Sequence, residues 1–219
     1  MKRAYYFEST EQFLLDSCEL IVGRLATAHE FSLDELQKNS WIEEIEILQD
    51  CLSSFSGGHI ALEFSIPRMG NRVDAVILSS GIVFVIEFKV GEYEFRRSAI
   101  DQVVDYALDL KNFHETSHSR LLIPVIVATN AESVVLEMEL QDDRLMIPVC
   151  ANKFDLSNHL RAIAEHFHEP EIDALVWLNG RYRPTPTIIE AAQALYRGHD
   201  VTEISRSESD VGNLHATAG

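Results

Sequence analysis

Cysteines are few in this sequence, and no apolar run is long. The three cysteines, Cys18, Cys51 and Cys150, are widely spaced and form no C-x-x-C pair. This set argues against a disulfide framework and is typical of reduced thiols in a cytoplasmic protein. The longest apolar runs, at residues 82–86 and 121–128, are far shorter than the roughly 20 residues of a membrane helix. The N-terminal sequence MKRAYYFEST contains no apolar signal segment. We therefore expect a cytoplasmic protein without membrane attachment.

Basic residues are also few. The chain has 18 Lys and Arg against 35 Asp and Glu, a formal net charge of −17. Proteins that bind nucleic acid through its phosphates usually carry a basic surface, so this balance argues against tight binding by the chain alone. Residues 66–97 are the exception, with a net charge of +1. The candidates for nucleic-acid contacts in this segment are its arginines, Arg68, Arg72, Arg96 and Arg97.

The rest of the composition suits one α/β domain. With 219 residues, of which 46% are hydrophobic and 24% charged, the chain can bury a core of ordinary size. We expect residues 1–39 to form an N-terminal helical extension and residues 40–202 to form the domain. Residues 203–219 are rich in Ser, Asp, Gly and Asn and are expected to form a flexible tail or linker.

Apolar periodicity and turn signals predict the order of the elements. Helices are predicted at residues 10–28, 40–52, 98–113, 156–166 and 188–196. Strands are predicted at residues 60–66, 73–78, 82–88 and 120–129, with further strands at 145–149 and 174–178. A capping box formed by Ser40 and Glu43 marks the expected start of the second helix.

The most informative stretch is DAVILSSGIVFVIEFK, from Asp74 to Lys89. Two strand-like runs flank a Ser-Ser-Gly turn signal, so we expect a hairpin. Folding would bring Asp74 beside Glu87, while Glu87 and Lys89 point to the same side because side chains alternate along a strand. Two carboxylates and an ammonium then meet at the end of an apolar element, where their burial is costly unless a cation or substrate compensates them. The pattern indicates a metal-dependent phosphodiesterase site.

Two predicted helices can add side chains to this site. Gln102 and Tyr106 are four residues apart, so they share one helical face and point together towards the strand end. On the helix predicted at residues 40–52, Glu44 borders the apolar face and can reach the site. An ordinary surface glutamate is an equal alternative for Glu44.

The pattern D-x12-E-x-K, followed by Q-x-x-x-Y at residues 102–106, resembles the signature of the PD-(D/E)XK nuclease superfamily in its RecB-like branch. The resemblance implies an α/β protein with a restriction-endonuclease-like core, a central mixed β-sheet flanked by helices in the order αβββαβ, here with additional C-terminal helices. It implies that Asp74, Glu87 and the backbone carbonyl of Phe88 hold Mg²⁺ or Mn²⁺, with Glu44 as a candidate further ligand. Lys89 would orient the attacking water, and the Q-x-x-x-Y pair would position Lys89 or the substrate.

A longer similarity covers most of residues 40–205. The sequences IPRMG, EFKVG and NFHETSH within this range resemble the N-terminal region of large bacterial proteins that continue into a Schlafen-type DNA/RNA helicase domain. No G-x-x-x-x-G-K-[ST] phosphate loop is present in this sequence. The resemblance implies a nuclease that hydrolyses DNA or RNA with a helicase domain or subunit, in defence or repair. A non-cleaving nucleic-acid-binding module and a protein-interaction module of a helicase are the alternatives.

A second motif points to different chemistry. His114-Glu115-Thr-Ser-His118 matches H-E-x-x-H, in which two histidines one turn apart bind zinc and the glutamate activates water. Here the match falls at the expected end of a helix, its middle residues are polar, and no third ligand stands out downstream. A zinc peptidase is therefore a remote alternative, and a structural role for His114 is favoured.

Overall fold

The computed structural model describes the whole chain except residues 1, 30–33, 187, 190–192 and 194–219. Its centre is a six-stranded mixed sheet in the order β1-β2-β3-β4-β5-β6, antiparallel from β1 to β4 and parallel from β4 to β6. The strands are β1 (Tyr6–Ser9), β2 (His59–Ile66), β3 (Asn71–Ser79), β4 (Ile82–Lys89), β5 (Leu121–Ala128) and β6 (Val149–Ala151). The expected α/β class with a mixed sheet is confirmed.

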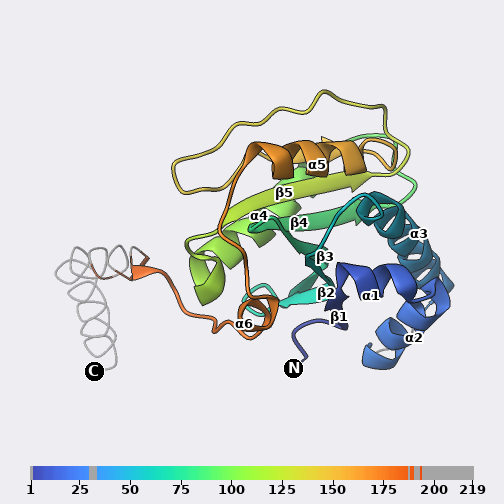
Figure 1. Ribbon diagram of the computed structural model, residues 1–219, viewed down its shortest axis with the longest axis horizontal. Coiled ribbons are helices and arrows are strands. Elements are labelled where there is room, and N and C mark those ends of the chain that lie inside the picture. The colour runs from blue at the N-terminus through green and yellow to red at the C-terminus, as the bar shows by residue number, and fades with distance from the viewer. Residues whose placement is uncertain (1, 30–33, 187, 190–192, 194–219) are drawn as a thin grey trace, which may run out of the picture.

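Helices cover both faces of this sheet (Figure 1). They are α1 (Thr10–Leu15), α2 (Cys18–Ala28), α3 (Glu35–Leu52), α4 (Arg97–Phe113), the 3₁₀ turn η1 (Glu115–Ser117), α5 (Leu156–His166) and α6 (Ala174–Leu178). Apolar side chains of α1, α2, α3 and α5 share one core with one face of the sheet. Side chains of α4 and α6 pack in a second core on the opposite face.

The hairpin of β3 and β4 forms as the sequence predicts. Ser79 pairs with Ile82, and the two intervening residues, Ser80 and Gly81, have φ angles of 52° and 75°. Positive φ at both central residues is the requirement of a type I′ turn, whose twist matches that of antiparallel strands. The next connection runs through α4 to β5, which lies parallel to β4. The middle of the chain therefore has the predicted order helix, three strands, helix, strand.

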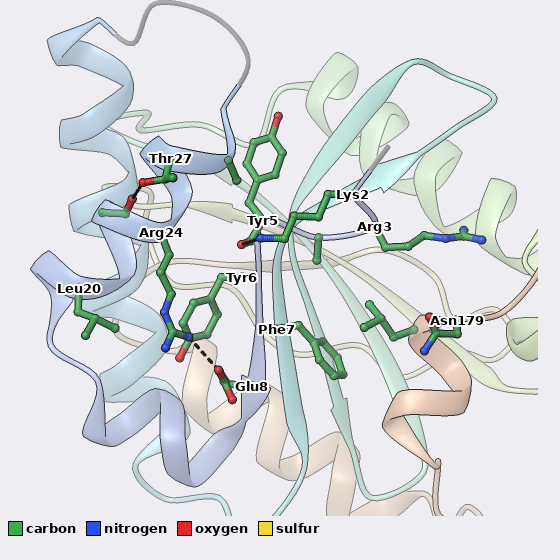
Figure 2. Close-up of a pocket in the computed structure, with 14 residues that line it drawn as sticks. Lys2, Arg3, Tyr5, Tyr6, Phe7, Glu8, Leu20, Arg24, Thr27 and Asn179 are labelled. Atoms are coloured by element: carbon green, nitrogen blue, oxygen red, sulfur yellow. Dashed lines mark hydrogen bonds and ion pairs between the residues drawn. The ribbon is translucent and has the colours of Figure 1, made fainter.

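The described part of the N-terminal segment, residues 2–29, differs from the prediction. Tyr6–Ser9 forms strand β1, which was not expected, and pairs with β2 at the edge of the sheet. This strand and the residues before it border an open groove of about 1290 Å³, whose other walls come from α2 and from the C-terminal end of α6 with Asn179 (Figure 2). The N-terminal residues thus belong to the same sheet as the rest of the domain, and the predicted boundary at residue 39 falls inside α3.

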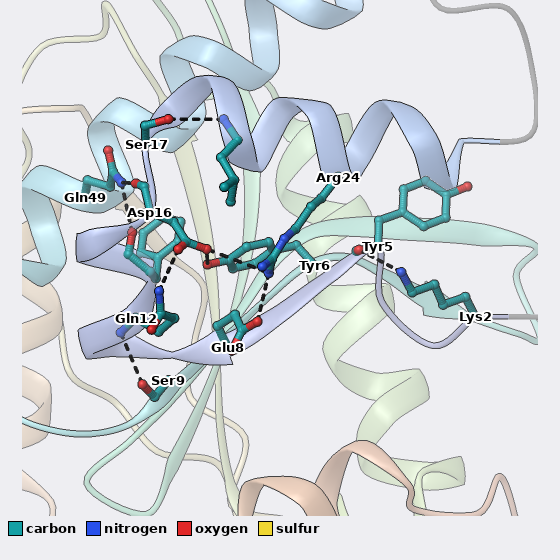
Figure 3. Close-up of polar contacts among 12 residues, drawn as sticks. Lys2, Tyr5, Tyr6, Glu8, Ser9, Gln12, Asp16, Ser17, Arg24 and Gln49 are labelled. Carbon is teal, nitrogen blue, oxygen red and sulfur yellow. Dashed lines mark hydrogen bonds and ion pairs between the residues drawn. The ribbon is translucent and has the colours of Figure 1, made fainter.

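The single helix predicted at residues 10–28 is wrong, because the chain forms α1 and α2 with a break between them. Asp16 is extended at the C-cap of α1, and the Ser17 side chain accepts a hydrogen bond from the Leu20 N–H to begin α2. The Asp16 carboxylate accepts hydrogen bonds from the Tyr6 hydroxyl at 3.0 Å and from Gln12 Nε2 at 2.6 Å (Figure 3). These contacts hold the break against β1.

Three further predicted elements need correction. Helix α3 begins at Glu35 with Asp34 as its N-cap, not at Ser40. The strand expected at residues 145–149 is β6, at Val149–Ala151. The strand expected at residues 174–178 is helix α6, because the Asp173 side chain caps it by accepting from the Val176 N–H.

The helix predicted at residues 188–196 lies mostly, and the tail at residues 203–219 entirely, outside the described residues. No helix in the described part is long and apolar enough to cross a membrane.

Candidate active site

The hairpin places Asp74 where the pairing of β3 with β4 ends. The last pair of this ladder is Ala75 with Ile86. Beyond it, the Phe88 N–H donates to Asp74 Oδ2 at 2.7 Å instead of to a backbone carbonyl. Because the N–H and C=O of a strand residue point to the same side, the Phe88 carbonyl also faces β3. The Asp74 carboxylate and the Phe88 carbonyl thus lie together at this end of the sheet.

Glu87 and Lys89 meet α4 on the same side of β4, as the alternation predicts. The Lys89 ammonium donates to Glu87 Oε1 at 2.9 Å and to Gln102 Oε1 at 3.1 Å. Gln102 Nε2 lies 2.9 Å from Glu87 Oε1 and 2.9 Å from the Tyr106 hydroxyl, which accepts from it. The predicted pairing of the Q-x-x-x-Y residues on one helical face is present, and it orients the Lys89 ammonium.

One oxygen of Glu87 accepts no hydrogen bond from an N–H or hydroxyl group. Glu87 is only 5% exposed, and its Oε2 atom is buried without a hydrogen bond. A buried carboxylate oxygen without a donor is costly. Burial raises the pKa of Glu87, whereas the charge of Lys89 and hydrogen bonds with Lys89 and the Asp74 carboxyl group oppose this rise. Burial and the charge of Glu87 also raise the pKa of Asp74 well above its ordinary value. A cation between these carboxylates would relieve both effects.

Glu44 approaches the same acids from α3. It is half-buried, and burial together with the charges of Glu63 and Glu87 raises the pKa of its carboxyl to about 8. Of the two alternatives for Glu44, this placement favours the one in which it reaches the site.

Glu63 on β2 is a further acid whose charge acts on Glu44 and Asp74, and sequence reasoning missed it. Its Oε1 accepts a hydrogen bond from Trp41 Nε1 at 2.7 Å, one turn of α3 before Glu44. Burial raises the pKa of the Glu63 carboxyl. The only local signal was an acid within an apolar strand.

The donor set fits a magnesium ion better than a closed metal cage. Among the described residues, no group of three or more His, Cys, Asp or Glu side chains is arranged to hold a metal ion. The candidate set has two carboxylates, from Asp74 and Glu87, and the carbonyl of Phe88. Mg²⁺ is commonly bound through one or two carboxylates, with waters and substrate phosphates as its other ligands. The unpartnered Glu87 Oε2 is consistent with such an ion.

The predicted nucleic-acid-binding arginines all have partners within the chain. Arg72 donates to the backbone carbonyls of Glu63 and Lys2, and Arg68 lies 3.6 Å from Asp109 and over the Phe113 ring. Asp109 is seven residues beyond Gln102, about 10 Å along α4, so Arg68 is displaced from the site. The other two form exposed ion pairs, Arg96 with Glu92 and Arg97 with Asp101. Arg96 also lines a cavity of about 230 Å³ beside Lys89 and Gln102.

The H-E-x-x-H residues do not form a zinc-binding helix. Helix α4 ends at Phe113, and His114 has an extended backbone. The His114 ring is buried, its Nδ1 is 2.8 Å from Ser117 Oγ, and its ring packs edge-on against Trp177. Burial lowers the pKa of His114 to about 3. These contacts match the structural role that the sequence favoured.

Comparison of the chain with protein-family models, curated proteins and solved structures found no match.

Proposed function

We propose that this protein is a Mg²⁺-dependent nuclease with a restriction-endonuclease-like fold of the PD-(D/E)XK type. The observation that carries the proposal is the set formed by Asp74, Glu87 and Lys89 at one strand end, in which a buried Glu87 oxygen has no partner. The contacts of Gln102 with Lys89 and Glu87 support it, because the Q-x-x-x-Y element belongs to the same resemblance.

Each residue has a definite task in this proposal. Asp74, Glu87 and the Phe88 carbonyl hold the cation, with Glu44 at its side. When bound, Mg²⁺ supplies polarisation of the scissile phosphate and a lowered pKa of a coordinated water. The Lys89 ammonium, held between Glu87 and Gln102, orients the water and stabilises charge that develops on the phosphate. Gln102 and Tyr106 keep Lys89 in place.

The test is a cleavage assay on single-stranded DNA, duplex DNA and RNA with Mg²⁺, Mn²⁺ or EDTA. We expect divalent-dependent cleavage of at least one substrate, which Lys89→Ala abolishes without loss of the fold by circular dichroism. Glu46→Gln is the matched control, because Glu46 is exposed on α3 and outside the set. Full activity of Lys89→Ala would refute the assigned chemistry.

The net charge of −17 favours a second candidate, a non-cleaving protein-interaction module of a helicase. The second candidate would be favoured if the folded protein bound a divalent ion but cleaved none of the three substrates.

A further inference from the structure

The sheet ends at β1, and the outer edge of this strand is unpaired. In the described part of the chain, β1 pairs with β2 and with no other strand. Thr10 continues the register of this pair, and its N–H donates to the Gly58 carbonyl. Because hydrogen-bonded residues alternate along an antiparallel strand, Tyr6 and Glu8 also bond to β2, whereas Phe7 directs its N–H and C=O away from it. Such unpaired backbone groups are a template for pairing with another chain.

The groove beside β1 follows this edge. Four consecutive residues, Tyr5–Glu8, line it (Figure 2). Neighbouring side chains of a strand point to opposite faces, so a groove that touches four residues in succession runs along the edge of the strand and not over one face. Its volume of about 1290 Å³ exceeds the roughly 300–1,000 Å³ of a small-molecule site. The groove therefore has the course and the size to hold an extended segment of chain.

The two walls of the groove belong to opposite faces of the sheet. One wall is α2, whose buried residues pack in the core with α1 and α3, and the other is the end of α6, which packs in the opposite core. Arg24 on α2 forms an ion pair with Glu8 at 2.8 Å (Figure 3). Arg3 Nη2 donates to the Gly180 carbonyl, just beyond α6, at 2.7 Å. These contacts fix both walls beside β1, and the groove lies where a further strand of the sheet would lie.

The lining of the groove suits the side chains of such a strand. Gly23 leaves room on the α2 wall, because a Cβ atom there would meet nothing within 4 Å apart from its own helix backbone and chain neighbours. Phe7, Leu20 and Leu178 contribute apolar surface, and Leu20 is 45% exposed. Strand addition takes its affinity from main-chain hydrogen bonds and its specificity from pockets for alternate side chains. Apolar side chains at alternate positions of the added segment meet these conditions.

The charge of the groove indicates the chemistry of the segment. The groove carries a net charge of +2 on a chain whose net charge is −17; its charged lining residues are Lys2, Arg3, Glu8 and Arg24. Arg24 is matched by Glu8, whereas Lys2 and Arg3 donate to backbone carbonyls. An acidic segment complements these two cations, and the charge of −17 opposes the approach of a second copy. Nucleic acid is also anionic, but it has no row of N–H and C=O groups to pair with the strand edge.

We propose that the edge of β1 is a docking site for an acidic, extended segment of a partner protein, which adds to the sheet as a further strand. The backbone of the segment pairs with Phe7, its apolar side chains contact the walls formed by α2 and α6, and its acids lie beside Lys2 and Arg3. The inference does not depend on the proposed nuclease function.

Two substitutions test the groove and its charge. Gly23→Leu fills the groove, and it should melt at or above the wild-type temperature, because Leu is the better helix residue and the position has room. Gln37→Leu is the matched control, since it places the same side chain on an exposed position of α3, away from the residues that line the groove. Lys2→Glu reverses an exposed charge. The probes are peptides selected from a random phage-displayed library on the wild type and then synthesised with a fluorescent label.

The selected peptides should be acidic, with β-branched or aromatic residues at alternate positions, and should protect the Phe7 amide from hydrogen exchange. In fluorescence anisotropy, Gly23→Leu and Lys2→Glu should each weaken binding at least about tenfold, because overpacking and a like-charge contact both oppose association. Gln37→Leu should bind as the wild type does.

The proposal is overturned if no peptide is selected, or if Gly23→Leu binds the selected peptides as tightly as the wild type. Full affinity in Lys2→Glu would overturn the acidic character of the partner. Protection of the Phe7 amide in the free protein would mean that the chain itself or a second copy fills the groove. A dimer in analytical ultracentrifugation that Gly23→Leu abolishes would assign the groove to a second copy, and oligonucleotide binding lost in Gly23→Leu would assign it to nucleic acid; either result replaces the proposed partner.

Discussion

At the scale of single residues, the acids of the site are held in conditions that oppose their charge. Desolvation and mutual repulsion raise the pKa of Asp74, and burial raises those of Glu44 and Glu87. A folded state with carboxyl pKa values above those of the unfolded chain is destabilised by their ionisation at neutral pH. We therefore expect the same carboxylates that would bind a cation to lower the stability of the metal-free protein.

Asp74→Asn should raise the melting temperature in EDTA while removing cleavage. The amide oxygen can still accept the Phe88 N–H, but the repulsion by Glu87 is gone. A gain of about 1 kcal/mol corresponds to roughly 2–4 °C for a chain of this size. Differential scanning fluorimetry at pH 7.5, with Glu46→Gln as control, measures it. A lower melting temperature for Asp74→Asn would mean that the charged carboxylate stabilises the metal-free protein.

His114 should make the protein less stable in acid. Burial lowers its folded-state pKa from the ordinary value of 6.5 to about 3. Between these two pH values, the imidazole is therefore protonated in the unfolded chain and neutral in the folded protein. The contribution of His114 is complete above about pH 6.5 and is lost as the pH falls towards 3, at up to about 1.4 kcal/mol per pH unit. The raised carboxyl pKa values increase the stability as the pH falls, opposite to the effect of His114. The contribution of His114 must therefore be measured by comparing the wild type with a His114 variant.

Urea unfolding of the wild type and His114→Asn between pH 7.5 and pH 5 isolates this contribution. We expect the wild type to lose stability more steeply than the variant over this range. Parallel pH profiles would contradict the neutral, buried state of His114.

At the scale of elements, α4 connects the strand end to the rest of the core. Its inner face is buried through Val103, Tyr106 and Leu110, and the same face presents Gln102 to Glu87 and Lys89. The position of the Lys89 ammonium is thus determined by the packing of a helix, and not by the strand alone.

Gln102→Ala should reduce the cleavage rate about 10–100-fold, the range expected when a group that orients catalytic or metal-binding residues is removed. Gln102 is half-exposed, so the free energy of unfolding should change by about 1 kcal/mol or less. Tyr106→Phe is the matched variant, because it removes only the hydroxyl that accepts from Gln102, and a smaller loss is expected. Steady-state kinetics should show the effect in kcat rather than in KM; an unchanged kcat in Gln102→Ala would exclude a positioning role.

At the scale of the whole molecule, charge opposes the proposed substrate. The net charge is −17, and Arg68, Arg96 and Arg97 are each paired with an acid. Long-range repulsion of a polyanion should follow. We infer that substrate is delivered by a tethered or associated helicase, which raises the local concentration of strands at the site.

The chain alone should therefore bind DNA and RNA oligonucleotides with a Kd of about 10⁻⁶ M or weaker at physiological salt, the range of non-specific contacts. Fluorescence anisotropy with the inactive Lys89→Ala variant in Ca²⁺ measures this affinity. Nanomolar binding at 150 mM salt, on the usual scale of specific complexes, would contradict delivery by a partner.

Three features of the site were predictable from the sequence alone: the hairpin of β3 and β4, the position of Asp74 near Glu87, and the shared side of Glu87, Lys89, Gln102 and Tyr106. These features follow from local geometry, since alternation along a strand and the pitch of a helix depend only on residues close in the chain. The order helix, three strands, helix, strand was predictable for the same reason, because each element is long and strongly periodic.

The left-handed conformation of Glu63 and the helix at residues 174–178, in contrast, depend on tertiary contacts. The apolar residues of β2 alternate without interruption in the sequence, so nothing local indicates that its faces exchange at Glu63; Trp41, 22 residues away, holds that conformation. The run of residues 174–178 is apolar enough for a strand, but Trp177 packs on Phe64 and His114 from a short capped helix. In both places a contact between residues distant in the chain outweighs the local pattern, because burial of an aromatic side chain is worth more than the difference in intrinsic propensity.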